Sequence, residues 1–337
     1  MRIWGIHMGA HVASAPIENN YVAIGWPNFG DLTAVKPNRD AFKNQLAQTY
    51  PQINSGAIPV KAGVLFRFAN EIKEGDLVIY PSKNDRMVNV GCFDGSYQYI
   101  EGDSSGYPNQ RGVKWLGSYP RDEFAQAALN EIGSAVTLFT VRRYAQDFLE
   151  KVGFAEDAKN IAGEMDTIEE SEDDQTATDE VSRQAEVTTH DFIIRALKNQ
   201  LSPYDFEHFV AHIMECMGYT ARVTQASADG GVDVIAHKDE LGFEPPIIKV
   251  QCKQITGKSS EPEANQLLGT LGDGEFALFV NLGSYSRSAR VLERNRAKLR
   301  LIDGEQLVEI ILDNYHKLSP RYRTLMPLRQ IYVPDFV

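Results

Sequence analysis

Cysteine is scarce in this chain, and what the chain lacks limits what it can be. Its three cysteines, Cys92, Cys216 and Cys252, are an odd number without paired spacing, which suits a reducing compartment and indicates neither a disulfide framework nor a zinc cluster. No run approaches the roughly 20 apolar residues of a membrane-spanning helix, and the first residues, MRIWGIHMGAHV, lack the pattern of a signal peptide. We therefore expect a cytoplasmic protein without a membrane partner.

The excess negative charge is concentrated in one short segment. Residues 156–180 hold eleven acidic residues and one lysine, a net −10 out of the chain's −12. Residues 1–155 hold fifteen residues of each sign, and residues 191–337 hold nineteen acidic and seventeen basic residues. Because the acidic segment also has few apolar groups, it is predicted to be a solvated linker. The acidic composition therefore does not exclude a DNA partner.

The linker divides the chain into an expected N-terminal domain at 1–155, an acidic linker at 156–190 and a C-terminal domain at 191–337. In the N-terminal block, short runs such as YVAIGW, GDLVIY and MVNVGCF alternate with Gly, Pro, Asn and Asp. This pattern predicts a β-rich α+β module. Helical patches are expected at Asp40–Gln48 and Arg121–Ile132.

The C-terminal block predicts an α/β domain. The segment SPYDFEHFVAHIMECMG places Ser202 as a helix N-cap and Pro203 at the first helical position, followed by apolar residues on one helical face. The further predicted elements are strands at 221–225, 231–237, 247–253 and 276–281, with helices at 262–271 and 287–298. This mixed order favours a central mixed sheet flanked by helices.

Three polar residues lie in strands that are otherwise apolar. Asp233 is flanked by valines, while Gln251 and Lys253 alternate with apolar residues and so share one face of their strand. An isolated buried carboxylate is costly unless it is paired or binds a metal, and a buried ion pair between Asp233 and Lys253 is the structural alternative. The functional hypothesis is a metal-dependent nuclease. An aspartate and a main-chain carbonyl suit Mg²⁺, and a lysine on the same face can reach the attacking water or the phosphate.

Asp233, followed after seventeen residues by QCK, resembles the D-(E/Q)-x-K variant of the restriction-endonuclease fold. The resemblance is to the Mrr-like branch, in which glutamine replaces the acidic residue. It extends over about residues 200–315, through FEHFVAHIMECMGY, DGGVDVIA, DELGFEPPIIKVQCKQ, FALFVNLGSYSRSA and LRLIDGEQLVEII. It implies a restriction-endonuclease-like α/β fold and a type IV-like endodeoxyribonuclease that uses Mg²⁺, with Mn²⁺ as the other candidate ion.

The resemblance also implies individual roles. Asp233 matches the metal-binding aspartate, Gln251 the residue at the acidic position, and Lys253 the catalytic lysine. Glu207 matches the glutamate of the family's first helix, which helps to bind metal or water; a solvent-facing glutamate is the alternative. The expected metal ligands are Asp233, Glu207 and the main-chain carbonyl of Cys252. Since glutamine supplies no charge, the number and affinity of the metal ions are open.

A basic helix is expected to begin after Ser286. The segment RSARVLERNRAKLR holds six basic residues and Glu293, and both a helix N-terminus and such a charge density suit phosphate contacts. The candidates for contact with DNA phosphates are Ser286, Arg287, Arg290 and Arg294. A solvated basic face is the alternative.

All three tryptophans fall in the N-terminal block. The order IWGIHMG, GDLVIYPS and RGVKWL resembles EVE-type modules of the PUA-like superfamily, which are β-barrel-like and bind nucleic acids. Several of them read a modified base flipped into an aromatic pocket, which needs flat walls and polar groups for the base edge. The predicted walls are Trp26, Tyr80 and Trp115, and the predicted edge readers are Asp31 and Ser82. Tryptophans that fill a small core are the alternative.

These patterns predict an anti-phage restriction nuclease that reads modified double-stranded DNA, with a homodimer or higher oligomer as an option. No GxxxxGK[ST] motif occurs, so the chain is not expected to hydrolyse ATP. Two alternatives stay open: a defence nuclease activated by a small signalling nucleotide bound to the N-terminal domain, and a non-catalytic DNA-binding protein on the nuclease fold. The intact Asp233, Gln251 and Lys253 count against the second.

Overall fold

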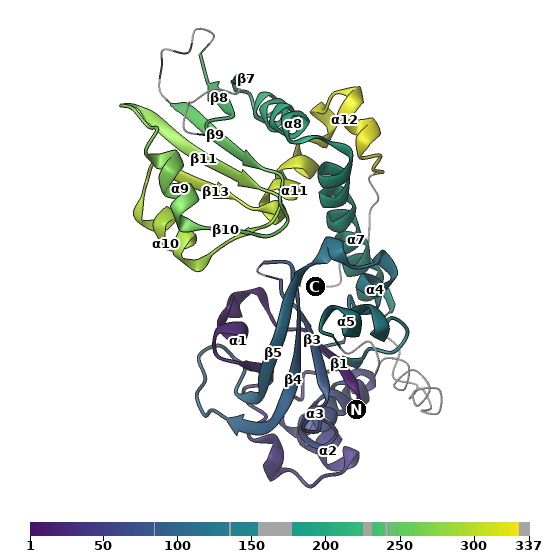
Figure 1. Ribbon diagram of the computed structural model, residues 1–337. Coiled ribbons are helices and arrows are strands. Elements are labelled where there is room, and N and C mark those ends of the chain that lie inside the picture. Colours follow the sequence, from purple (N-terminus) through teal and green to yellow (C-terminus); the bar gives the residue numbers. More distant parts are fainter. Residues whose placement is uncertain are drawn as a thin grey trace. The chain divides into compact units, whose positions relative to one another are not determined.

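The computed structural model shows a chain that divides into two compact units between Ala185 and Glu186 (Figure 1). It describes residues 1–83, 85–134, 136–153, 177–224, 231–239, 242, 244 and 246–329, with only the backbone at 177–184. Each unit is considered by itself.

The predicted acidic linker is only partly within the described residues. Residues 156–176 lie outside them, whereas residues 177–190 belong to helix α7, Ala177–Gln200. Later in the same helix, Ile193 and Leu197 are fully buried in the core of the C-terminal unit. The expectation that the linker continues to residue 190 is therefore wrong, because its last part is the start of a helix that packs into a domain core.

The N-terminal unit is built on a six-stranded sheet with the order β2-β5-β4-β3-β1-β6. Strand β1 is parallel to β3, and the other neighbouring strands are antiparallel. The strands are β1 (Ile3–Ile6), β2 (Tyr21–Ile24), β3 (Leu77–Pro81), β4 (Met87–Tyr99), β5 (Asn109–Pro120) and β6 (Leu138–Thr140). The α-helices are α1 (Ala15–Glu18), α2 (Arg39–Thr49), α3 (Ile58–Asn70), α4 (Gln126–Glu131) and α5 (Ala145–Lys151). This agrees with the β-rich α+β class, while the PUA- or EVE-like identity stays a prediction.

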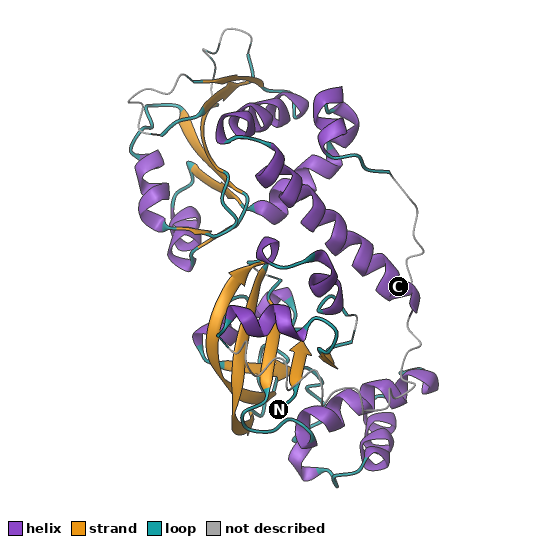
Figure 2. Ribbon diagram, turned by 45° about the vertical axis from the view of Figure 1, so that its right-hand side comes forward, coloured by secondary structure: helices purple, strands orange, loops and turns teal. Residues whose placement is uncertain are grey.

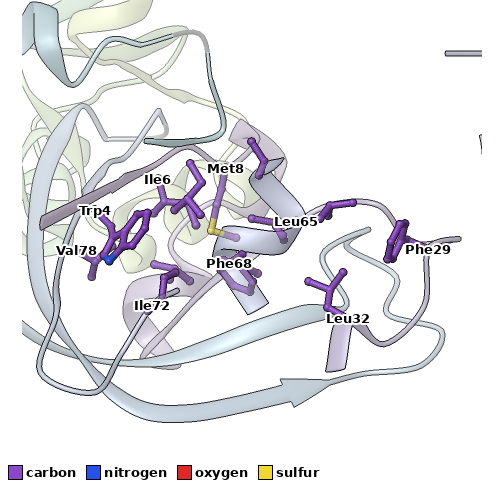
Figure 3. Close-up of a cluster of buried hydrophobic side chains, with 14 of the residues drawn as sticks. Trp4, Ile6, Met8, Phe29, Leu32, Leu65, Phe68, Ile72 and Val78 are labelled. Atoms are coloured by element: carbon purple, nitrogen blue, oxygen red, sulfur yellow. The ribbon is translucent and has the colours of Figure 1, made fainter. Parts of the chain in front are cut away.

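Apolar side chains on the two faces of this sheet form separate cores. Trp4 of β1 packs in the larger one with Phe68 of α3 (Figure 3). The neighbouring Ile3 lies in the second core with Phe148 of α5. Such alternation is expected because successive side chains of a strand point to opposite faces. Trp4 also donates a 3.0 Å hydrogen bond from Nε1 to Asp76 Oδ2, so this tryptophan is a structural residue.

The C-terminal unit contains a five-stranded mixed sheet with the order β13-β11-β9-β8-β7. Strands β13, β11 and β9 are parallel, and β8 is antiparallel to both β9 and β7. The strands are β7 (Thr220–Val223), β8 (Val234–His237), β9 (Ile247–Lys253), β11 (Glu275–Asn281) and β13 (Leu299–Ile302). The short strands β10 (Lys258–Ser259) and β12 (Ser284–Tyr285) form a separate parallel pair. The predicted central mixed sheet is confirmed.

Helices cover both faces of this sheet (Figure 2). Val234 and Val250 point to a core shared with helices α7, α8, α11 and α12. Phe279 and Leu301 point to the other face, which packs on α9 and α10. The helices are α8 (Pro203–Cys216), α9 (Glu261–Leu268), α10 (Arg287–Asn295), α11 (Gly304–Asp313) and α12 (Pro320–Leu325). The unit is a three-layer α/β/α arrangement, as the sequence predicts.

The first helix of this core begins as expected. The Ser202 hydroxyl accepts a 3.1 Å hydrogen bond from the backbone N–H of Asp205, and Pro203 is the first residue of α8. Among the described helices, none is long and apolar enough to span a membrane.

Candidate active site

Asp233 and Gln251 meet where the pairing of β8 with β9 ends. Val234 pairs with Val250 in the antiparallel register, and the Asp233 N–H donates a 2.8 Å hydrogen bond to the Val250 carbonyl. Extending this register by one residue places Asp233 opposite Gln251. The Asp233 carboxylate is also fixed, because its Oδ2 accepts a 2.6 Å hydrogen bond from the backbone N–H of Cys252.

The side-chain oxygen of Gln251 is buried without a donor. Its Oε1 makes no hydrogen bond within the described part of the chain. The nearby Gly231 has a φ of +86°, and a Cβ at this position would lie 2.8 Å from Gln251 Nε2. Glycine is therefore needed here both for the backbone conformation and for the space that the glutamine amide fills. Buried acceptors without a partner are rare, and one is a natural ligand for an ion.

Glu207 of α8 reaches this end of the sheet. Partial burial raises the pKa of its carboxyl, and the negative charge of Asp233 raises it further. Burial also raises the pKa of Asp233, although the hydrogen bond from Cys252 acts in the opposite direction. The two carboxyls thus lie close enough to interact, in a setting that disfavours their charges. The alternative of a solvent-facing Glu207 is less consistent with this placement.

These groups fit a hard divalent cation. Two carboxylates and the free Gln251 Oε1 are oxygen donors of the kind that Mg²⁺ prefers. A bound cation would offset both the burial that raises the pKa of each carboxyl and the repulsion by Asp233 that raises the pKa of Glu207 further. Burial raises the pKa of the Cys252 thiol well above its usual value, so this side chain stays protonated and only its carbonyl is a candidate ligand. Within the described residues no group of three or more His, Cys, Asp or Glu side chains is placed to hold a metal ion.

Lys253 does not pair with Asp233. Its Nζ forms an ion pair with Glu263 Oε1 of α9, so the buried Asp233–Lys253 pair of the structural alternative is not formed. Lys253 lies in register with Asn281 of β11. Glu263 is not among the residues predicted from the sequence, although the Ser260-x-x-Glu263 spacing is the signature of a helix capping box, which the structure shows.

The predicted phosphate-binding helix is shorter than expected and one of its arginines has another role. Ser286 is the N-cap of α10 and accepts a 3.2 Å hydrogen bond from Ala289 N. Arg290 forms ion pairs with Glu293 and Asp303 and donates a 2.9 Å hydrogen bond to the Leu301 carbonyl. The Arg290 guanidinium thus holds α10 against β13, and its contact with a phosphate stays a prediction.

The other candidates on α10 stay predictions. Arg287 and Arg294 are exposed, whereas Ser286 is partly exposed. The helix ends at Asn295, and Arg300 belongs to β13 instead. The basic residues after Asn295 are therefore not part of one helical face.

In the N-terminal unit the structure brings Tyr80, Ser82 and Trp115 together. The rings of Tyr80 and Trp115 have centroids 6.2 Å apart, and Ser82 hydrogen-bonds to Tyr80 while burial raises the pKa of this phenol. Tyr80 is only 1% exposed and Ser82 only 6%. Both are core residues, contrary to the prediction of a stacking wall and an edge reader. Trp115 is partly exposed and donates a 3.1 Å hydrogen bond from Nε1 to the Pro16 carbonyl.

Trp26 has a different set of neighbours. It is partly exposed, its ring packs edge-on against Tyr50 with centroids 5.2 Å apart, and Lys61 Nζ lies 5.2 Å from the ring. Its φ is +76°, a rare conformation for a bulky side chain that is commonest where function demands it. Among the described residues, no hydrogen bond or ring contact links Trp26 to Tyr80 or Trp115.

Asp31 has a structural role in its loop. Its Oδ1 accepts hydrogen bonds from Thr33 N at 2.9 Å and from the Tyr97 hydroxyl at 2.9 Å. These bonds lower the pKa of Asp31 in spite of the opposing effect of burial, which is the largest single influence. The carboxylate is thus already partly satisfied, and its role as a reader of a base edge stays a prediction.

In comparisons with known proteins, the two units match different families. Residues 198–311 match a family described as restriction endonuclease, and residues 4–143 match a family described only as a domain of unknown function. The chain is 27% identical over 129 residues to a protein of Escherichia coli (strain K12) described as the type IV methyl-directed restriction enzyme EcoKMrr. That similarity covers 36% of this chain and 42% of the relative, so the chain spans less than half of the relative's length.

Two solved structures also show similarity. The MspJI restriction endonuclease in complex with a 27-mer oligonucleotide is 14% identical, with a TM-score of 0.31 over 80% of this chain and 66% of the other. The DNA modification-dependent restriction endonuclease AspBHI is 14% identical, with a TM-score of 0.32 over 83% of this chain and 72% of the other. Both TM-scores are low, so the similarity of the C-terminal unit to restriction endonucleases rests on the family match at residues 198–311.

Proposed function

We propose that this chain is a metal-dependent DNA endonuclease of a restriction system that acts on modified double-stranded DNA. The proposal is supported by the restriction endonuclease family match at residues 198–311 and by the similarity of 129 residues of the chain to a methyl-directed enzyme. Magnesium is the proposed ion, with manganese as the substitute, because the site offers oxygen donors alone.

The observation that carries the proposal is the grouping of Asp233, Gln251 and Lys253 at one end of β8 and β9. Asp233 is held by the Cys252 N–H, Gln251 presents a buried oxygen without a donor, and Lys253 is held by an ion pair. A protein that used this fold only to bind DNA would have no need for a buried, unpaired acceptor. Such a group has an energetic cost that a catalytic ligand explains.

Each residue then has a chemical task. Asp233, Gln251, Glu207 and the Cys252 carbonyl would hold the cation, which when bound would neutralise charge that develops on the phosphate. Lys253 places its ammonium group against the attacking water or a phosphate oxygen. Hydrolysis forms a bond from the water oxygen to phosphorus and breaks one P–O bond to a deoxyribose, whose oxygen leaves with a proton. These tasks involve only the phosphate, the cation and water, which carry no sequence information, so selectivity must come from elsewhere.

We assign selectivity to the N-terminal unit. Its net charge is zero over residues 1–155, so bulk electrostatics does not drive its binding to DNA. A pocket that recognises a specific group is the remaining means, and Trp26 and Trp115 are the partly exposed aromatic candidates for its walls. This assignment extends the EVE- or PUA-like resemblance.

The test is cleavage of plasmids that differ only in defined base modifications. The purified chain is incubated with Mg²⁺, without ATP and without added effectors, and the Lys253→Ala variant is the matched control. We expect cleavage of a modified plasmid by the wild type, none in EDTA, and none by the variant. No cleavage of any plasmid, or equal cleavage by the variant, would refute the proposed activity.

A further inference from the structure

We infer that Glu263 is a positioning residue that holds the Lys253 ammonium group in place for cleavage. This inference rests on the proposed endonuclease function and adds a residue to it. Glu263 lies in the first turn of α9, outside the Asp233–Gln251–Lys253 pattern. Its Oε1 forms an ion pair with Lys253 Nζ.

The Glu263 carboxylate is fixed from its other side. Its Oε2 accepts hydrogen bonds from the backbone N–H of Ser260 at 2.6 Å and from the Ser260 hydroxyl at 3.0 Å. These bonds belong to the capping box of α9. One oxygen is thus engaged by the start of the helix, and the other is directed to the lysine. A lysine has four rotatable bonds and a mobile ammonium group, so an anchored partner defines where this group lies.

The start of α9 is itself tied to the strand that pairs with Lys253. Asn281 lies in register with Lys253 on β11, and its Nδ2 donates hydrogen bonds to Ser259 Oγ at 3.1 Å and to the Ser284 carbonyl at 3.0 Å. Ser259 immediately precedes the cap residue Ser260. The position of the Glu263 carboxylate is therefore set by the same sheet that carries Lys253.

Close packing makes this segment rigid. A Cβ at Gly283 would lie 2.1 Å from the Gly257 carbonyl oxygen, so the loop before β10 passes directly over the loop after β11. Ser259 and Asn281 are both fully buried. A rigid support is what a catalytic group needs, because a small displacement of such a group costs much of the rate.

The ion pair contributes position more than stability. The side chains of Lys253 and Glu263 are 29% and 31% exposed, and partly exposed ion pairs add little to folding stability. The exposure also leaves the lysine accessible to a DNA phosphate. Loss of the anion should therefore lower the rate of cleavage and leave folding intact.

The test distinguishes the role of the Glu263 charge from the role of Glu263 in the capping box of α9. Glu263→Gln keeps a capping-box residue, since glutamine serves at this position as glutamate does, but it removes the charge that holds Lys253. We expect its single-turnover cleavage rate to fall by about 10- to 100-fold, the range for residues that orient a catalytic group. Its Kd for DNA and its Tm should equal those of the wild type.

Two control variants complete the experiment. Glu261→Gln removes the same charge from the same helical turn and should cleave at the wild-type rate, because in the part of the chain that the structure describes the Glu261 carboxylate makes only a 3.5 Å contact with Asn265. Glu263→Asp keeps the charge on a shorter side chain and should recover part of the rate. Wild-type cleavage by Glu263→Gln, or an equal loss in Glu261→Gln, would overturn the positioning role. Either result leaves the proposed endonuclease intact as long as Lys253→Ala is inactive.

Discussion

Asp233 and Gln251 lie opposite each other at the last step of the pairing between β8 and β9, and each depends on the other strand for its position. The Asp233 N–H bonds to the Val250 carbonyl at 2.8 Å, and its carboxylate accepts the Cys252 N–H at 2.6 Å. Gln251 takes the space that Gly231 leaves open. The site is thus assembled by strand register, so small changes at its edge should have large effects on cleavage.

The first prediction concerns Gly231→Ala. The left-handed φ of +86° makes any Cβ unfavourable, by roughly 1–2 kcal/mol, and this Cβ would also meet Gln251 Nε2 at 2.8 Å. We expect a lower Tm together with at least a tenfold loss of cleavage, because the amide must move. Gly218→Ala is the matched control, since Gly218 has a φ of +87° and no atom within 4 Å of its Cβ position. Equal cleavage losses in the two variants would contradict the role of Gly231.

The second prediction concerns the charge of Asp233. Burial raises the pKa of this carboxyl, so the fold favours its protonated form, and stability is lost as the pH rises through the folded-state pKa. At pH 8 the carboxylate is ionised, and Asp233→Asn removes this cost while its amide oxygen still accepts from Cys252. We expect the variant to have a higher Tm than the wild type in EDTA at pH 8, with the difference declining toward acidic pH, and to be inactive in cleavage.

Added Mg²⁺ extends this test. A ligand that binds only the folded state stabilises it, by about 2.7 kcal/mol at 100 times its Kd. Mg²⁺ should therefore raise the Tm of the wild type and have little effect on Asp233→Asn. A variant that is less stable than the wild type in EDTA at pH 8 would show that the buried charge is not a cost to the metal-free protein.

The third prediction distinguishes the structural role of Arg290 from the proposed DNA contacts of Arg287 and Arg294. Arg290→Ala leaves Glu293 and Asp303 without their shared cation, and unsatisfied partly buried groups cost about 1–3 kcal/mol. This variant should lose stability. Arg287→Ala combined with Arg294→Ala should instead weaken DNA binding, with the salt dependence of log K reduced by about one unit per lost phosphate contact. Thermal unfolding measures the loss of stability in Arg290→Ala, and binding titrations at several salt concentrations measure the loss of phosphate contacts in the double variant. An unchanged salt dependence would show that neither Arg287 nor Arg294 contacts a phosphate.

Much of the catalytic site was predictable because its signal is local. A polar residue between valines, and a glutamine and a lysine two residues apart in an apolar strand, stand out in any β pattern. Glu263 was missed because its partner is chosen by the packing of α9 against the sheet, which no local pattern specifies. The ion pairs of Arg290 were not predictable for the same reason, since the sequence does not show whether a basic residue on a helix faces solvent, DNA or an acidic neighbour.

Elements whose apolar residues follow no simple period were harder to predict. Helix α3, Ile58–Asn70, was missed because IPVKAGVLFRFAN is apolar on most sides, as expected of a helix that packs in a core. Tyr80 looked like a pocket wall in sequence, because an aromatic residue at the end of a strand does not reveal its burial. The structure places it at 1% exposure, whereas Trp26 keeps part of its surface open.

The final prediction concerns the reading of modified DNA by the N-terminal unit. Binding is measured with the Lys253→Ala variant, which is expected to leave the DNA uncut. This variant should bind a methylated duplex more tightly than the same duplex without the methyl group. A methyl contact in an apolar pocket is worth about 1–3 kcal/mol, roughly tenfold or more in affinity. Trp26→Ala should reduce this preference and preserve the circular dichroism spectrum, because Trp26 is partly exposed. Trp26→Phe should retain part of the preference, since it keeps an aromatic face.

Trp4→Ala is the contrasting control for this unit. Trp4 is fully buried and bonds to Asp76, so its loss should unfold the unit, with a core substitution cost of about 3–5 kcal/mol. Unfolding by Trp26→Ala would show that Trp26 also fills the core. If methylated and unmethylated duplexes bind equally, the unit does not read this modification. Activation of cleavage by added cyclic nucleotides would then favour a signalling nucleotide as its ligand, because a sensor of that kind needs no difference in affinity between the two duplexes.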